Sequence, residues 1–171
     1  MQDTIILVGM TGSGKSTIGR YLSDALGYSF IDMDDYIEEK AAITIPELFQ
    51  LGEDYFRTLE SSACQDMINF KRAVISTGGG AIIKQENREA LHRAGLIIWI
   101  DRPLEHILSD IKIENRPLLA SGKKRINSLY TERKELYALS ADHVVKNNLS
   151  LEDTVDQLIL IIKNKEQELN K

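Results

Sequence analysis

Residues 9–16 read Gly-Met-Thr-Gly-Ser-Gly-Lys-Ser, and this segment constrains the fold more than any other part of the sequence. It matches the pattern G-x-x-x-x-G-K-[ST] in full. A short apolar run, residues 4–8, precedes it, and a helical pattern follows. Between a strand and a helix, glycines let successive backbone N–H groups turn towards a phosphate, and the helix N-terminus adds partial positive charge. The segment therefore predicts a binding site for a nucleoside triphosphate.

Two positions of this phosphate-binding loop have specific expected roles. Lys15 brings a mobile positive charge to the β- and γ-phosphates, and the Ser16 hydroxyl is an expected ligand of Mg²⁺. A regulatory GTPase is excluded, because the D-x-x-G match at 24–27 closes the first helix and residues 164–167 lack the aspartate of N-K-x-D. The residues expected to hold ATP are Gly12, Ser13, Gly14, Lys15, Ser16 and Thr17.

Further apolar runs of strand length alternate with helical patterns along the chain. They are residues 28–31, 73–76, 96–100 and 143–146. Such runs are apolar on both faces, as in a parallel sheet that is covered on both sides. Thr44-Ile45-Pro46-Glu47 reads as a capping box with proline in the first turn of a helix. These patterns predict an α/β fold with right-handed crossovers.

Composition and charge exclude several classes of protein. The 171 residues hold 21 Lys+Arg and 26 Asp+Glu, a net charge of −5, so we expect no global attraction to nucleic acid or an anionic membrane. The length predicts a single domain over residues 1–171. The single cysteine, Cys64, cannot form an internal disulfide, and no basic leader or apolar stretch of about 20 residues is present. We therefore expect a soluble cytoplasmic protein.

Two carboxylates close the second strand pattern, which runs Ser-Phe-Ile-Asp-Met-Asp over residues 29–34. In an extended segment residues i and i+2 point to the same side, and ligands bind at the carboxyl edge of a parallel sheet. Asp32 is therefore expected to hold Mg²⁺ through water, and Asp34 to reach farther, towards an acceptor hydroxyl. A solvated acidic turn is the alternative interpretation.

Arg57 and Glu60 lie three positions apart on a predicted helix, so the carboxylate can fix the guanidinium. A guanidinium held in this way suits bidentate capture of a substrate carboxylate, and an exposed ion pair is the alternative. Gly78, Gly79 and Gly80 follow the third strand. Three consecutive glycines allow the backbone to approach a ligand closely.

Residues 110–124 mix charges with Asn115, Pro117 and Gly122 and lack a helical stripe. A loop of this length in a compact protein is usually functional, so we interpret it as a lid. The alternative is a tolerated surface insertion.

Together these segments resemble the shikimate kinase family. The resemblance covers nearly the whole chain and implies transfer of the γ-phosphoryl group of ATP to the 3-hydroxyl of shikimate, on the route to chorismate and the aromatic amino acids. It also implies a three-layer fold of the nucleoside-monophosphate-kinase type, with a five-stranded parallel sheet between helices. The matching segments, in order, are the phosphate-binding loop, 32–34, 57–60, 78–80, 116–119 and 133–137.

The resemblance implies roles for single residues. Asp34 would bind the shikimate hydroxyls and orient the attacking one, and Arg116 in the lid would close onto the phosphates of ATP. Arg57 and Arg133 would clamp the shikimate carboxylate, beside the Gly79 N–H. The implied catalytic residues are Lys15, Asp34 and Arg116.

The adenine-binding residues are left open by one departure from the family pattern. Ser109 stands where some members place an arginine that stacks on adenine, so Lys112, or apolar contacts and backbone, are the alternatives.

Two other functions are alternatives. One is a gluconate-type or nucleoside-monophosphate kinase, and the other is a non-catalytic ATP-binding module that regulates a partner. Asp34 with the two arginines favours a small polyhydroxy carboxylate as acceptor, and a regulatory module needs no carboxylate clamp. We expect ATP, Mg²⁺ and shikimate as ligands, no nucleic-acid or membrane partner, and a monomer.

Overall fold

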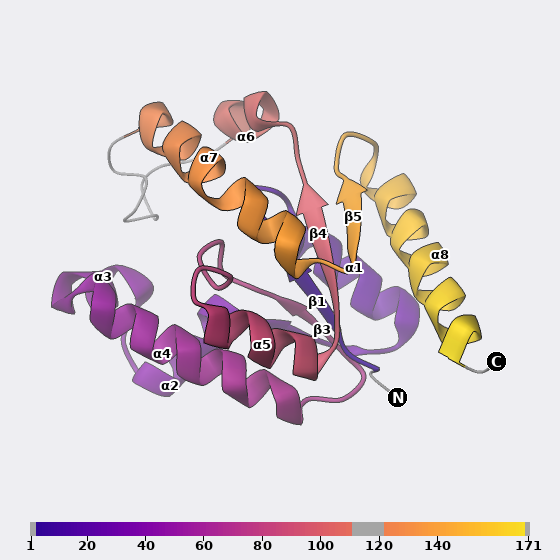
Figure 1. The fold of residues 1–171 in the computed structure, drawn as a ribbon, viewed down its shortest axis with the longest axis horizontal. Coiled ribbons are helices and arrows are strands. Elements are labelled where there is room, and N and C mark those ends of the chain that lie inside the picture. Colours follow the sequence, from indigo (N-terminus) through magenta and orange to yellow (C-terminus); the bar gives the residue numbers. More distant parts are fainter. Residues whose placement is uncertain (1–2, 111–121, 170–171) are drawn as a thin grey trace.

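The structure is a computed structural model that describes residues 3–110 and 122–169. Strands and helices alternate along the chain, and Figure 1 shows the sheet between two groups of helices. The elements are β1 (Ile5–Val8), α1 (Lys15–Leu26), β2 (Ser29–Asp32), α2 (Met33–Ala41), α3 (Ile45–Leu51), α4 (Glu53–Asp66), a 3₁₀ turn η1 (Met67–Asn69), β3 (Ala73–Ser76), α5 (Gln85–Ala94), β4 (Leu96–Asp101), α6 (Leu104–Asp110), α7 (Lys123–Ser140), β5 (His143–Lys146) and α8 (Leu151–Leu169).

The five strands form one parallel sheet in the order β2-β3-β1-β4-β5. The chain leaves β1 towards β2 on one side, and it leaves β3 towards β4 on the other. Adjacent strands whose connections diverge in this way open a crevice at their carboxyl ends, where ligands bind in open α/β sheets. The loops that follow β1 and β3 meet at this crevice.

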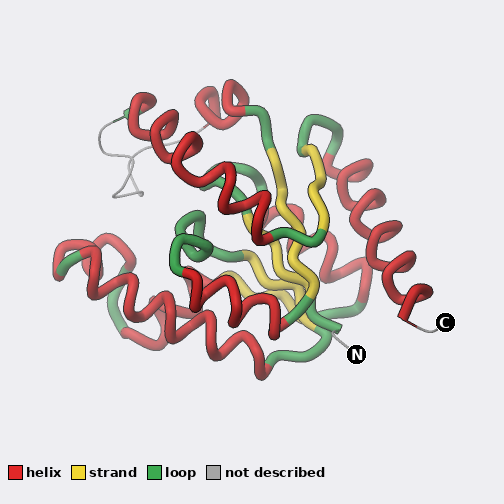
Figure 2. Tube along the Cα trace, in the orientation of Figure 1, coloured by secondary structure: helices red, strands yellow, loops and turns green. Residues whose placement is uncertain are grey.

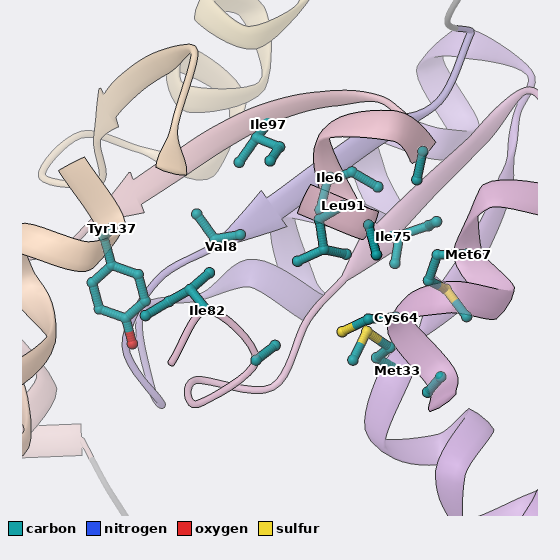
Figure 3. Packing of buried hydrophobic residues seen from close by; sticks show 14 of the residues in the cluster. Ile6, Val8, Met33, Cys64, Met67, Ile75, Ile82, Leu91, Ile97 and Tyr137 are labelled. Carbon is teal, nitrogen blue, oxygen red and sulfur yellow. The ribbon is translucent and has the colours of Figure 1, made fainter. Parts of the chain in front are cut away.

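Alternate residues of the strands face two separate cores. Ile5 and Leu7 of β1 pack with α1 and α8, whereas Ile6 and Val8 pack with the helices of the other face. Figure 2 shows α4, α5 and α7 on that second face of the yellow strands. In the larger core, Figure 3 shows Met33, Cys64 and Met67 grouped at one end and Tyr137 at the other.

The structure confirms the predicted α/β class and the five strands, with bounds that shift by a residue at most. The capping box is present, since Thr44 and Glu47 bond each other's backbone at the start of α3. The expectation of strands buried on both faces is wrong for the sheet edges, because β2 and β5 are partly exposed. Within the described residues, no helix is long and apolar enough to cross a bilayer.

Candidate active site

A cleft of about 960 Å³ opens at the carboxyl edge of the sheet. Its phosphate half is lined by residues 11, 12 and 14–17 of the phosphate-binding loop, together with Asp32 and Ser76. Its other half, here called the arginine half, is centred on Arg57 and Arg133, with Gly78–Gly80 beside them. The two halves meet where Gly79 lies against Thr11.

The phosphate-binding loop is wrapped around the Lys15 side chain. The Lys15 ammonium donates to the carbonyls of Gly9 (2.8 Å) and Met10 (2.9 Å), and α1 begins at Lys15 itself. Lys15 is only 7% exposed, so its charge lies in a site of low dielectric. Ser13 is fully buried and belongs to the wall of the loop, whereas Gly12, Gly14, Lys15, Ser16 and Thr17 line the cleft.

Three oxygen-bearing side chains converge below the loop. The Ser16 hydroxyl donates to Asp32 Oδ2 (2.6 Å) and lies 3.0 Å from the Ser76 hydroxyl. A carboxylate and hydroxyls are the oxygen ligands that Mg²⁺ prefers, and the cluster adjoins the phosphate loop. These residues therefore fit a magnesium ion bound together with a nucleotide. Ser76 is an addition that the sequence patterns did not single out.

Asp32 and Asp34 both line the cleft, but the extended-strand argument for their common direction is wrong. β2 ends at Asp32, which caps α2 by accepting a hydrogen bond from the Asp34 N–H (3.0 Å). Asp34 lies in the first turn of α2, where a negative charge also interacts favourably with the helix dipole. A strand-to-helix turn, and not an extended segment, therefore brings both carboxylates to the site.

In the arginine half, Arg57 is buried and held by two carboxylates of its own helix. It donates to Glu60 Oε1 (2.7 Å) and to Glu53 Oε1 (3.2 Å), and its side chain is 9% exposed. The predicted Arg57–Glu60 contact is confirmed, and the alternative of an exposed pair is wrong. Burial raises the pKa of Glu60, while the Arg57 and Arg133 charges oppose the shift.

Arg133 and Tyr137 bring α7 into the same half. Arg133 is 5% exposed, and Tyr137 is fully buried one turn further along the helix. The Tyr137 hydroxyl donates to the Gly79 carbonyl (2.6 Å), and its ring stacks on Trp99 with centroids 5.7 Å apart. Burial raises the pKa of Tyr137 to about 12, so the hydroxyl keeps its proton at neutral pH.

The three glycines make room for side chains of the site. A Cβ on Gly78 would lie 2.9 Å from Asp34 Oδ1, and one on Gly79 would lie 2.9 Å from Thr11 Oγ1. A Cβ on Gly80 would lie 2.3 Å from Arg57 Nη1. A side chain is therefore least tolerable at Gly80, against the buried Arg57 guanidinium, and at Gly78 and Gly79 it would displace Asp34 and Thr11.

Several features of the cleft escaped sequence reasoning. Apolar side chains line part of its wall, and the Phe49 and Phe56 rings are tilted by 32° with centroids 4.6 Å apart. Arg102 lines both this cleft and a smaller adjoining cavity of about 390 Å³. Arg116 and Lys112 lie outside the described residues, as does most of the predicted lid. Ser109 is exposed at the end of α6 and bonds the His106 carbonyl and Asp110.

A phosphate-binding loop that shares one cleft with a second polar compartment, at the switch point of a parallel sheet, defines the class of P-loop kinases. Comparison with known proteins is more specific. The family model described as shikimate kinase matches residues 11–163. The chain therefore belongs to the shikimate kinase family.

Individual relatives agree with this assignment over their whole lengths. The chain is 48% identical to a shikimate kinase of Clostridium botulinum over 96% of this chain and 99% of that protein. It is 46% identical to one of Clostridium beijerinckii, over 95% and 96%. A solved structure of the shikimate kinase of Acinetobacter baumannii in complex with shikimate superposes with a TM-score of 0.89 at 36% identity, covering 95% of this chain and 94% of that one.

Proposed function

We propose that this protein is a shikimate kinase, which transfers the γ-phosphoryl group of ATP to the 3-hydroxyl of shikimate to give shikimate 3-phosphate and ADP. The reaction belongs to the route to chorismate and the aromatic amino acids. The observation that carries the proposal is the pair of buried arginines, Arg57 and Arg133, in the same cleft as the phosphate loop. Membership of the shikimate kinase family supports it.

The arginine half suits an anionic ring with hydroxyl groups. Arg57 and Arg133 would bind the carboxylate, because a guanidinium matches a carboxylate with two parallel hydrogen bonds. The Gly79 N–H would lie beside them. The aromatic rings of Phe49 and Phe56 offer an apolar wall for the carbon skeleton. A nucleotide acceptor has no carboxylate for the arginines to bind.

Asp34 would accept a hydrogen bond from the attacking hydroxyl and set its direction towards the γ-phosphorus. It lies beside Gly78 and lines the same cleft as the phosphate loop. Positioning of this kind is most of what phosphoryl transfer asks of a protein. Asp34→Asn is expected to lower kcat by about 10²-fold, within the range of a lost general acid–base group.

Charge neutralisation would come from Lys15 and, closing from the segment 110–124, from Arg116. Ser16, and Asp32 through water, would hold Mg²⁺, which would supply positive charge to neutralise the phosphates. The burial of Lys15, and the loop carbonyls that hold its ammonium in place, support this role. Arg116→Ala is expected to lower kcat, and an unchanged kcat would remove Arg116 from the transition state.

A coupled assay of ADP release tests the proposal. The purified protein with Mg-ATP is given shikimate, gluconate or AMP in turn. We expect turnover with shikimate alone. Turnover with gluconate or AMP in place of shikimate would assign the protein to another kinase, and no acceptor-dependent turnover with any of the three would favour a regulatory ATP-binding module.

A further inference from the structure

Two side chains that follow neighbouring strands donate hydrogen bonds to backbone carbonyls of the phosphate loop. Asn147, directly after β5, donates from Nδ2 to the Ser13 carbonyl (2.8 Å). Arg102, directly after β4, donates from Nη1 to the Gly12 carbonyl (3.0 Å). Both residues line the smaller cavity, and Arg102 lines the larger cleft as well.

Each of the two side chains is itself held in place. The Asn147 backbone N–H donates to the Asp101 carbonyl (2.8 Å), which ties the residue to the end of β4. The Arg102 guanidinium also pairs with Asp110 at the end of α6. Donors fixed in this way hold the loop carbonyls without a further ordering cost when a ligand binds.

The geometry of the peptide bond links these contacts to the direction in which the loop N–H groups point. A trans peptide is planar, so its C=O and N–H point in opposite directions. The Ser13 carbonyl points at Asn147, and the N–H of Gly14 in the same peptide therefore points away from it. Gly14 lines both the larger cleft and the smaller cavity, and it belongs to the loop whose backbone N–H groups bind phosphate. We propose that Asn147 is a positioning residue for ATP, which aims the Gly14 N–H at the phosphates.

The neighbouring peptide is fixed in the same manner from both ends. Its carbonyl, that of Gly12, accepts from Arg102, and its N–H, that of Ser13, donates to the Met10 carbonyl (3.0 Å). Arg102 thus holds the Gly12–Ser13 peptide, and Asn147 holds the Ser13–Gly14 peptide that follows it. Together they preorganise the donors that a phosphate would meet.

The contact between Asn147 and the phosphate loop also favours glycine at position 14. Its φ of 95° lies in the region that favours glycine, and a Cβ there would lie 2.8 Å from Asn147 Nδ2. The last glycine of the motif is therefore needed for the approach of Asn147 as well as for the turn.

The inference rests on the proposed function, and ADP binding separates the two. Isothermal titration with Mg-ADP is carried out on the wild type, Asn147→Ala, Asn147→Asp and the matched control Asn164→Ala, whose site is exposed on α8. Loss of one neutral hydrogen bond predicts an ADP Kd about 3–10-fold higher for Asn147→Ala. Asn147→Asp places a carboxylate against the Ser13 carbonyl and is expected to lose more. The control keeps the wild-type Kd.

The kinetic readout distinguishes positioning from a general structural effect. In Asn147→Ala the KM for ATP is expected to rise by the same factor as the ADP Kd, with the KM for shikimate unchanged. An ADP Kd equal to that of the wild type in both variants would overturn the inference, and so would a parallel rise of both KM values. Failure of the proposed function would appear instead as a wild type that binds ADP but shows no shikimate-dependent turnover.

Discussion

The phosphate half of the cleft is made largely from one continuous segment, whereas the arginine half takes its side chains from α4 and α7 and its glycines from the loop after β3. In the first, backbone groups face the ligand and one lysine is enclosed by local carbonyls. In the second, a buried ion pair within α4 lies beside a loop whose Gly79 carbonyl is held by Tyr137 of α7. A backbone site is specified by local sequence, but a side-chain site exists only once the tertiary fold has formed.

The largest effect is expected from the lysine of the phosphate half. If Lys15 neutralises the transferring phosphoryl group as proposed, Lys15→Met should lower kcat by about 10²–10³-fold, as for the loss of one preorganised electrostatic group. Steady-state kinetics with Lys163→Met as an exposed control check this. A fall in kcat below tenfold would show that the phosphate half works through its backbone alone.

The next largest effect is expected from Arg133, and it distinguishes the arginine half from the phosphate half. Arg133→Ala removes a charged hydrogen-bond donor from the arginine half, so the KM for shikimate should rise by about 10–100-fold while that for ATP changes little. Lys134→Ala, an exposed neighbour on α7, is the matched control. Equal changes in both KM values would mean that the halves are not independent.

A smaller effect is expected from the residue that holds the glycine loop. Tyr137→Phe removes only the hydroxyl that bonds the Gly79 carbonyl, so the KM for shikimate should rise by about 2–10-fold, the range of a neutral hydrogen bond. The KM for ATP is the internal comparison. An unchanged KM for shikimate would show that the glycine loop holds its shape without Tyr137.

These contacts show which parts of the site a local sequence pattern could predict. The loop at 9–16 sits between a strand and a helix, so its local pattern was sufficient. The Tyr137–Gly79 bond joins residues 58 positions apart, and the Asn147–Ser13 bond joins residues 134 apart. No local pattern specifies such pairs. Asp34 was placed correctly at the cleft by an incorrect local argument, because strand ends at the carboxyl edge converge whether or not the strand continues.

The smallest expected effect concerns stability and pH. Burial raises the pKa of Glu60 above its ordinary value of 4.5, so the folded state holds the proton more tightly than the unfolded chain. This tighter proton binding adds to the free energy of unfolding. The gain is complete below pH 4.5 and is lost as the pH rises through the folded-state pKa of Glu60. Glu60→Gln has no carboxyl group to titrate at this position and lacks this gain. The stability of the variant relative to the wild type should therefore increase as the pH rises from 4. Urea unfolding at several pH values checks this, with the exposed Glu135→Gln as control; parallel pH curves for wild type and Glu60→Gln would contradict it.

The most direct test of the arginine half compares the binding of shikimate and its methyl ester, which lacks the negative charge. Equilibrium titration of both ligands to the wild type and to Arg133→Ala forms a closed cycle. If the arginines bind the carboxylate, the wild type prefers shikimate over the ester by about 10–100-fold, and most of this preference disappears in Arg133→Ala. An equal preference in both proteins would contradict the carboxylate clamp.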